Sequence, residues 1–347
     1  MELVKILGAR RLRWVGMFVM IISLFLTACG ANKEQQANTN PQTKEKLRIG
    51  YLNVMDDAQV MLAYDAGFYE KNGLEVEVQI FNSGPEMIKA IVGGQLDAGV
   101  LGFTNAVTWA DKGADLKVIS GAQMGYHSLL VRSDRNIKTI PDLKGKQLAT
   151  QKQGSTADIV LNGVVLKEGN LTRNDVNMVY VSPSVAIQSL TAGKVDAAFL
   201  FEPYDRIARK TIPVTPLYDV GEEWPFPCMV AITSGKILQE KQIAINKMLD
   251  AQKEAIEMLE NQPKEAAKIL AKRFIETETI DTTNGRINSV DLIAEAIEAQ
   301  TFNWEITQEN IQQMKDIVQM MVDQQMLSKP LNVEDILDLS WQNKKQS

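Results

Sequence analysis

The chain has 347 residues, of which 45% are hydrophobic and 23% charged, and its formal net charge is −6. These proportions are typical of a folded globular protein and exclude extensive disorder. Two cysteines and one histidine are too few for a multi-thiolate zinc site, an iron–sulfur cluster or a multi-histidine metal site. We therefore expect no metal and no cofactor, and His127 is the single histidine available as a base.

The N-terminus has the pattern of an export signal. Four basic residues precede an apolar run at 14–26, which is short for a membrane-spanning helix and typical of a signal peptide. The run ends in Leu26-Thr27-Ala28-Cys29-Gly30. This motif resembles the bacterial lipobox, which implies acylation of Cys29 and a signal peptide at 1–28. An ordinary signal peptide with a chance cysteine is the alternative.

Removal of residues 1–28 makes the protein more acidic. Lys plus Arg falls from 37 to 33 and Asp plus Glu from 43 to 42, so the net charge becomes −9. An acidic chain is a poor partner for a phosphate backbone, so we expect no nucleic-acid binding. Residues 29–46 are polar without periodicity and are expected to form a disordered tether. Cys228 then has no thiol partner and is expected to be a buried small hydrophobe.

The folded part alternates predicted strands and helices. Strands are expected at 46–52, 74–81, 96–102 and 116–124, and helices at 58–73 and 83–94. The pattern returns with strands at 146–151, 176–181 and 195–201 and helices at 156–170 and 182–194. Such an order predicts mostly parallel sheets covered by helices. Gly94-Gln95-Leu96-Asp97-Ala98 recurs as Gly193-Lys194-Val195-Asp196-Ala197, which favours two lobes with a common plan.

Two α/β lobes predict a ligand cleft where the carboxyl ends of their strands meet. Three pairs of loops would face it: 53–57 with 153–156, 83–84 with 182, and 102–105 with 201–204. Backbone N–H groups at helix starts favour an anionic group, and hydroxyl groups add donors there. For each hydroxyl taken singly, a plain N-cap role is the alternative. The hydroxyl residues are Ser83, Thr104, Ser155, Thr156 and Ser182.

Four segments resemble the substrate-binding proteins of ABC importers, in the nitrate/sulfonate/taurine group. They are residues 50–102, 137–158 ("IKTIPDLKGKQLATQKQGSTAD"), 182–208 ("SPSVAIQSLTAGKVDAAFLFEPYDRIA") and 230–235 ("VAITSG"). The resemblance implies the type II periplasmic-binding-protein fold, with lobe one at 47–132 plus 226–347 and lobe two at 133–225. It also implies C-terminal helices that pack on and around lobe one, expected at 238–260, 262–274, 288–300, 307–326 and 333–341.

The implied mechanism is capture of a small molecule by hinge closure, followed by docking on a membrane permease that a cytoplasmic ATPase powers. The chain itself has no G-x-x-x-x-G-K-[ST] motif, so nothing indicates that it hydrolyses ATP. We expect a monomer that is not an enzyme, held by its lipid on the extracytoplasmic face of the cell membrane.

The resemblance carries several positions onto the ligand site. They are Ser83-Gly84, Gly102-Phe103-Thr104, Gly154-Ser155-Thr156 and Glu202. The residues themselves add Asn53, Asp56, Asp57, His127, Ser182 and Tyr204 as candidates. Phe103, Trp109, Tyr126, Phe201 and Tyr204 could form an aromatic wall, although each is as readily a core residue.

The ligand class stays open at this point. A carboxylate at Glu202 disfavours a bare anion such as nitrate, because like charges would have to be desolvated together. It suits an amine, as in the zwitterion taurine, and Asp56 and Asp57 point the same way unless they only cap a helix. An alkanesulfonate, a thiamine-precursor pyrimidine or another flat heteroaromatic remains an alternative. A lone histidine such as His127 is more often a wall or hinge residue than a catalyst.

Two kinds of enzyme and a sensory protein are the alternatives to a transport protein. A pyrimidine synthase of thiamine biosynthesis shares the resemblance but carries a cysteine-rich motif that this chain lacks. A hydrolase is disfavoured because there is no G-x-S-x-G elbow. A sensory lipoprotein that uses the same fold without transport remains open.

Overall fold

The computed structural model describes residues 44–346. The expected signal peptide, Cys29 and most of the expected tether lie outside this range. The folded part begins slightly earlier than expected, since Glu45 and Lys46 already belong to β1 (Glu45–Leu52).

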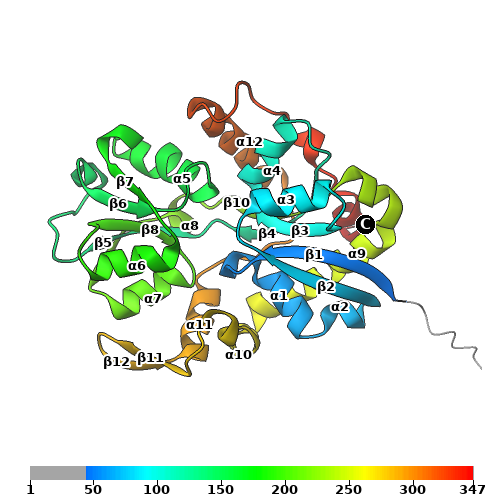
Figure 1. Ribbon diagram of the computed structural model, residues 1–347, viewed down its shortest axis with the longest axis horizontal. Coiled ribbons are helices and arrows are strands. Elements are labelled where there is room, and N and C mark those ends of the chain that lie inside the picture. Colours follow the sequence, from blue (N-terminus) through cyan, green and yellow to red (C-terminus); the bar gives the residue numbers. More distant parts are fainter. Residues whose placement is uncertain (1–43, 347) are drawn as a thin grey trace, which may run out of the picture. The chain divides into compact units, whose positions relative to one another are not determined.

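The first sheet has five strands in the order β2-β1-β3-β10-β4. β1 pairs in parallel with β2 (Leu74–Phe81) and β3 (Ala98–Gly102). β10 (Pro227–Thr233) runs antiparallel between β3 and β4 (Lys117–Met124). The helices associated with this first sheet include η1 (Met55–Asp57), α1 (Ala58–Asp65), α2 (Phe68–Lys71), α3 (Gly84–Val92) and α4 (Phe103–Asp111). We call this sheet with its helices the first lobe (Figure 1).

The second sheet repeats this plan in the order β7-β6-β8-β5-β9. β6 (Gln147–Thr150) pairs in parallel with β7 (Asn177–Tyr180) and β8 (Ala197–Phe201). β5 (His127–Arg132) runs antiparallel between β8 and β9 (Val214–Asp219). This sheet and its helices form the second lobe, drawn in green in Figure 1. Its helices are η2 (Ile140–Leu143), α5 (Thr156–Val160), the π-helix η3 (Leu161–Leu166), η4 (Arg173–Asp175), α6 (Pro183–Thr191) and α7 (Tyr204–Thr211). α8 (Val220–Glu223) lies in the segment that leads back to the first sheet.

The strands and helices expected in the two copies are confirmed with small shifts at their ends. The expected helix at 58–73 is divided, because Gly67 at φ +75° separates α1 from α2. Left-handed backbone of this kind favours glycine and interrupts a helix. The helix expected at 156–170 continues from α5 directly into η3.

The strand at 127–132 corrects the expected boundary between the lobes. The resemblance places residues 127–132 in lobe one, with a crossing near Arg132, and predicts no strand there. In the structure it pairs with β8 and β9 of the second sheet. The chain therefore crosses between Met124 and His127, and it returns between Asp219 and Pro227.

The C-terminal part is helical, as expected, but it contacts both lobes. It comprises α9 (Gly235–Asn261), α10 (Pro263–Phe274), the hairpin β11 (Thr279–Thr282) and β12 (Gly285–Asn288), α11 (Ser289–Glu298), α12 (Gln308–Asp323), η5 (Val333–Ile336) and α13 (Ser340–Gln346). The hairpin was not predicted. Lys210 of α7 forms an ion pair with Glu295 of α11 (Nζ–Oε2, 2.7 Å), and Gln324 donates from Nε2 to the Ile159 carbonyl (2.9 Å). The expectation that these segments pack around lobe one alone is incomplete.

Candidate functional site

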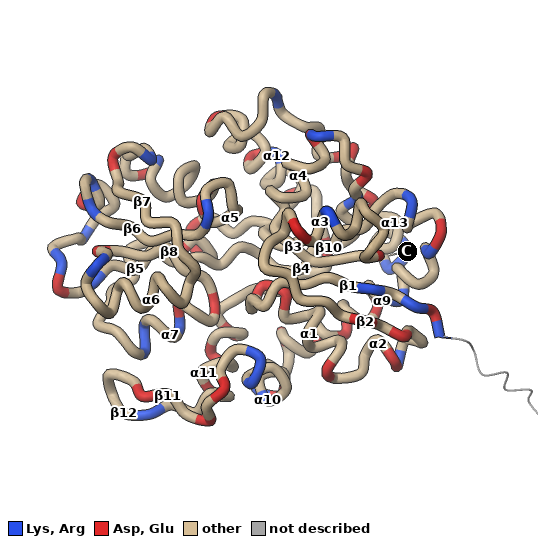
Figure 2. Tube along the Cα trace, viewed as in Figure 1, with Lys and Arg blue, Asp and Glu red and all other residues tan. Residues whose placement is uncertain are grey.

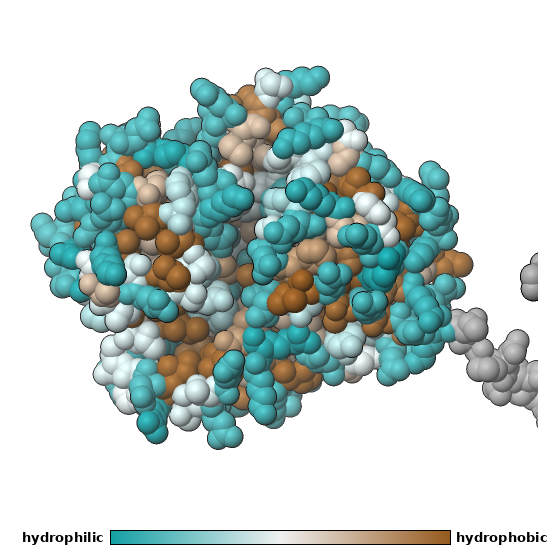
Figure 3. All heavy atoms as spheres, in the orientation of Figure 1, coloured by the Kyte–Doolittle hydropathy of each residue, from teal (hydrophilic) through white to brown (hydrophobic). Residues whose placement is uncertain are grey.

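The two lobes touch where strand-end loops meet. Thr104 of α4, after β3, and Thr156 of α5, after β6, place their Oγ1 atoms 2.9 Å apart. The backbone of Gly102 also lies close, since a Cβ added there would be 2.6 Å from Thr156 Oγ1. The third loop of the first lobe therefore faces the first loop of the second lobe. Figure 3 shows the surface hollowed between the lobes.

Asp56 and Asp57 lie in η1 directly after β1, and both side chains are buried. Asp57 accepts the Leu52 N–H at Oδ2 (2.6 Å), while Oδ1 of each residue has no hydrogen-bond partner in the described part of the chain. Burial raises the pKa of Asp56 to about 7. Burial, opposed by the Leu52 N–H and aided by the neighbouring Asp56, raises the pKa of Asp57 well above its ordinary value.

Cys228 of β10 lies near this acidic pair. It is the free cysteine of the described residues and is buried, as expected. Burial and the charges of Asp56 and Asp57 raise the pKa of its thiol well above the ordinary value. The thiol is therefore neutral and unreactive, which fits a packing role.

Glu202 follows β8 in the second lobe and is completely buried. Its Oε2 accepts the Arg206 N–H (3.2 Å), and its Oε1 lies 3.5 Å from Arg206 Nη2, outside good hydrogen-bond geometry. Burial, followed by the charge of Asp205, raises the pKa of Glu202 well above its ordinary value. Arg206 thus partly neutralises the carboxylate that the sequence assigns to the ligand.

His127 begins β5 and is enclosed by aromatic rings. Its imidazole stacks on Phe199 (centroids 5.4 Å apart, planes at 16°) and on Phe226 (6.3 Å, 20°), and Phe201 approaches at a tilt (5.9 Å). Burial lowers the pKa of His127 to about 4, so the ring is neutral near pH 7. Its Nδ1 is buried without a partner.

The Gly154-Ser155-Thr156 turn was expected to offer backbone donors to an anion. In the structure Gly154, at φ +82°, donates its N–H to Asp158 Oδ2 (2.8 Å). The Ser155 N–H donates to the Lys152 carbonyl (3.0 Å). Ser155 Oγ accepts the Asp158 N–H (3.3 Å), which is the N-cap alternative. Asp158 was missed as a candidate, although a carboxylate three residues after a serine is a recognisable helix-start signal.

The remaining candidates have mostly structural contacts. Ser182 is exposed and caps α6 through the Val185 N–H (3.4 Å). Asn53 is exposed and donates to the Arg273 carbonyl (3.2 Å). Gly84, next to half-buried Ser83, allows α3 to approach Asn105 closely.

The aromatic candidates do not form one wall. Phe103 and Phe201 are buried in the core. Half-buried Tyr204 meets Phe201 edge to face (5.7 Å). Tyr126 donates its hydroxyl to Asp219 Oδ2 (3.0 Å), and Trp109 carries Lys112 over its ring (5.9 Å). The aromatic groups that cluster are instead those around His127.

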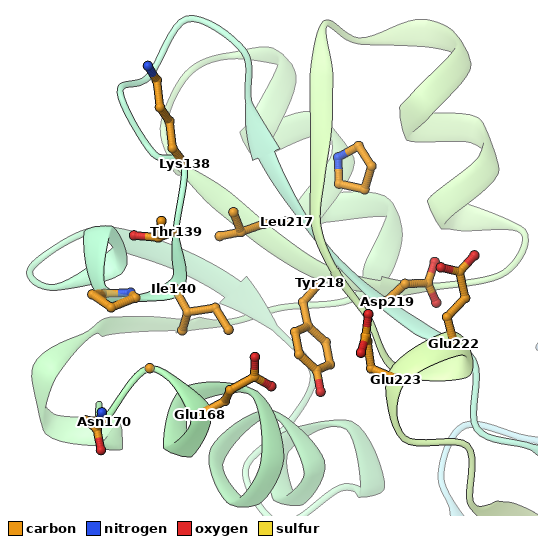
Figure 4. A pocket seen from close by; sticks show the side chains of 13 residues that line it. Lys138, Thr139, Ile140, Glu168, Asn170, Leu217, Tyr218, Asp219, Glu222 and Glu223 are labelled. Carbon is orange, nitrogen blue, oxygen red and sulfur yellow. The ribbon is translucent and has the colours of Figure 1, made fainter.

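Three cavities lie beside the expected cleft rather than in it. One, of about 560 Å³, opens on the second lobe, and Figure 4 shows Glu168 and Tyr218 directed toward each other, with Glu222 and Glu223 nearby. A second, of about 350 Å³, adjoins the crossing segments at Gly125 and Gly221. A third, of about 630 Å³, lies between η3 and the end of α12 and includes Gln153. Thr104 and Thr156, where the lobes touch, line none of these three cavities.

The charge distribution offers no metal site in the described part of the chain. Among residues 44–346, no group of three or more His, Cys, Asp and Glu side chains is placed to hold a metal ion. Acidic and basic residues are interspersed along both lobes (Figure 2). In the same range, no helix has the length and apolar character needed to cross a bilayer.

Comparison with known proteins assigns the chain to one family. The profile of the NMT1-like family matches residues 40–275. The chain belongs to the NMT1-like family. This confirms the expected relationship to the substrate-binding proteins of ABC importers.

Individual relatives agree with this assignment. A "Putative ABC transporter periplasmic binding protein" of Brachyspira hyodysenteriae is 26% identical and covers 94% of each chain. A "Putative aliphatic sulfonates-binding protein" of Bacillus subtilis is 30% identical over 54% of this chain and 57% of its own. The crystal structure of the periplasmic aliphatic sulphonate binding protein SsuA from Escherichia coli superposes with a TM-score of 0.72 at 22% identity, over 86% of this chain and 98% of SsuA. The two-lobed α/β periplasmic-binding-protein fold is thereby confirmed.

Proposed function

We propose that this protein is the extracytoplasmic solute-binding lipoprotein of an ABC importer. It would capture a small organic solute between its lobes by hinge closure and deliver it to a permease. The observation that carries the proposal is the meeting of Thr104 and Thr156 across the lobes. Each lobe also has buried acceptor atoms that lack partners, at strand-end positions. The family and the relatives named for binding support it.

The hinge would lie in the two segments that cross between the lobes, at 125–126 and 220–226. The first lobe would then comprise residues 45–124 with β10 and most of the C-terminal helices, and the second lobe 127–219. Two short crossing segments can absorb a rotation while each sheet moves as a body. Opening would separate Thr104 from Thr156 and expose the strand-end loops to solvent.

The ligand we propose is a zwitterion of the aminosulfonate kind, represented by taurine. Unpartnered acceptors occur on both lobes: Asp56 Oδ1 and Asp57 Oδ1 on the first, Glu202 Oε1 on the second. Buried acceptors without partners are costly, and a ligand that donates hydrogen bonds would relieve that cost. A bare anion such as nitrate offers no hydrogen-bond donor and would leave these buried acceptors without partners.

A flat heteroaromatic ligand is the second candidate. Its support is the stack formed by Phe199, His127 and Phe226, whose rings are nearly parallel. All three rings are buried, so opening of the lobes would have to expose one of them before a planar ligand could stack on it.

We further propose that the chain has no catalytic activity. Buried His127 has a lowered pKa, and the rings around it, Phe199, Phe201 and Phe226, are not nucleophiles.

The membrane attachment rests on the sequence alone. Acylation of Cys29 after cleavage at residue 28 would place two or more acyl chains in the bilayer, which together hold a protein firmly. The polar tether at 29–46 would then let the lobes reach a permease beside the anchor.

Thermal unfolding of the purified protein in the presence of candidate solutes tests the function. A ligand at one hundred times its dissociation constant adds about 2.7 kcal/mol to the free energy of unfolding. We expect taurine to raise the midpoint and nitrate to leave it unchanged. Glu202→Gln, which keeps the size of the side chain, should reduce the taurine effect. A folded sample, shown by mass spectrometry to be ligand-free, that responds to no sulfonate, amine or pyrimidine would refute the proposal.

A further inference from the structure

Asp158 is a completely buried carboxylate in the first turn of α5, and it has contacts from four sides. Oδ2 accepts the Gly154 N–H and Arg173 Nη2, both at 2.8 Å. Oδ1 accepts Asn162 Nδ2 (3.1 Å) and the Tyr180 hydroxyl (3.4 Å). Buried polar groups are normally hydrogen-bonded, and this carboxylate has partners on both of its oxygens.

These contacts, together with two others, engage the backbone N–H groups of Gly154 and Ser155 and the two side-chain hydroxyls of the turn at 154–156. The Gly154 N–H donates to Asp158 Oδ2, and the Ser155 N–H donates to the Lys152 carbonyl. Ser155 Oγ is occupied by the Asp158 N–H, and Thr156 Oγ1 is shared with Thr104. A ligand acid group that approached this turn would find these four groups already engaged.

The charge at this position is also balanced. Arg173 pairs with Asp158, and its Nη1 donates to the Tyr180 hydroxyl (2.6 Å). An incoming sulfonate would therefore meet a carboxylate whose cation is already taken, and like charges in a buried site repel strongly. Without Asp158, by contrast, the Gly154 N–H and the Arg173 guanidinium would both be free to bind an anion.

We propose that Asp158 is a built-in anion that positions the 154–156 turn and denies it to the acid group of a ligand. It is a specificity-determining and positioning residue. The part of the ligand that contacts this turn is then neutral or cationic, and any acid group of the ligand is held elsewhere. This statement about the ligand rests on the proposed function, but the occupancy of the turn by Asp158 does not.

Creation of an anion site tests the proposal directly. Sulfate binding is measured by titration calorimetry on the full chain in detergent, at constant ionic strength, for the wild type and Asp158→Ser. We expect at least a tenfold gain in sulfate affinity in Asp158→Ser, and loss of that gain when Arg173→Gln is added. Asp142→Ser is the matched control, because Asp142 also accepts backbone N–H groups at the start of a short helix of the second lobe. It should show no gain.

Amide hydrogen exchange at Gly154 provides a second measurement. We expect Gly154 to be protected in the wild type and in Asp158→Asn, whose side-chain oxygen still accepts, and to exchange faster in Asp158→Ser. If Asp158→Ser does not fold, Asp158→Asn should still gain sulfate affinity, because Arg173 loses its charge partner. A folded variant without that gain, or an unprotected Gly154 in the wild type, overturns the proposal. Failure of the solute-binding function would appear differently, as a wild type that binds no solute at all.

Discussion

The hydroxyl groups of Thr104 and Thr156 lie 2.9 Å apart, although they belong to helices on different sheets. Each helix starts at the carboxyl end of the strand before it, so the contact joins the two strand ends that a ligand would have to separate. This direct bond makes the closed arrangement measurable without any ligand.

A double-mutant cycle should detect the Thr104–Thr156 bond. Thr104→Val and Thr156→Val keep the shape of each side chain, and we expect a coupling of about 1 kcal/mol in the free energy of unfolding measured with urea. Thr150→Val is the control, because Thr150 Oγ1 is buried without a partner, and its replacement should be neutral or stabilising. A coupling near zero would show that the lobes stand apart in solution.

The pair Asp56 and Asp57 should make stability depend on pH. Their folded pKa values are raised, that of Asp56 to about 7, so the folded state binds protons more tightly than the unfolded chain. Stability from this pair is therefore fully present below about pH 4 and is lost as the pH rises toward 7 and above.

We expect Asp56→Asn with Asp57→Asn to remove that part of the pH dependence. The variant should gain on the order of 2 kcal/mol relative to the wild type between pH 5 and pH 8, in urea unfolding of ligand-free protein. Asp142→Asn, an exposed carboxylate, serves as the control and should show no relative gain. Equal pH profiles for the wild type and the double variant would contradict the burial of an unpaired acidic pair.

The crossing segments should be sensitive to a single methyl group. A Cβ added at Gly125 would lie within 2.7 Å of Phe226 Cδ1, and one at Gly221 would lie against the ring of Tyr126. Each crossing segment thus packs its glycine against an aromatic ring of the other. We expect Gly125→Ala to destabilise the protein by about 1–3 kcal/mol through overpacking, measured by urea unfolding.

Phe226→Leu added to Gly125→Ala should restore part of that loss, because the smaller side chain makes room. Gly113→Ala is a useful comparison: Gly113 has open space around it, but its φ of +82° adds a backbone cost of about 1–2 kcal/mol that no neighbouring substitution can relieve. A Gly125→Ala variant with the stability of the wild type would mean that the two crossing segments do not pack closely at Gly125 and Phe226.

Replacement of the lipobox cysteine should release the protein from the membrane. We expect Cys29→Ser to abolish labelling with radioactive palmitate in cells and to shift the protein from the membrane to the soluble fraction, since the acyl chains provide the anchoring energy. Cys228→Ser, a change at a buried thiol, should leave labelling unchanged. Labelling that persists in Cys29→Ser would refute the lipid anchor at this position.

Much of the architecture could be predicted because short-range sequence patterns determine where its strands and helices form. The alternation of apolar strands with capped helices, and the recurrence of Gly-x-apolar-Asp-Ala, gave both copies of the lobe plan. Asp97 and Asp196 confirm the recurrence structurally. Each accepts the N–H of a residue in the second strand of its sheet order, Arg48 of β1 and Gln147 of β6 (2.8 and 2.9 Å). Local periodicity could not show which sheet an apolar strand joins, so β5 was placed in the wrong lobe.

The site was predicted less completely than the fold. The strand-end loops were identified from topology, and Gly102, Thr104 and Thr156 are indeed brought together. Whether a backbone N–H at a turn remains free depends on long-range partners, however. Arg173 and Tyr180 reach Asp158 from 15 and 22 residues away, and no short motif reveals that they hold this carboxylate against Gly154.

The positions at which the chain crosses between its sheets have a consequence for how such a protein can be taken apart. Met124 and Pro227 are register partners in the first sheet, and Ser128 and Asp219 are register partners in the second. Cross-strand partners lie only about 5 Å apart. Residues 127–219 are thus an insertion into the first lobe, and the two ends of this insertion are neighbours. The two residues of the first lobe between which it is inserted are also neighbours. A short loop could close either piece, so recombination between relatives could exchange one module and leave the other intact.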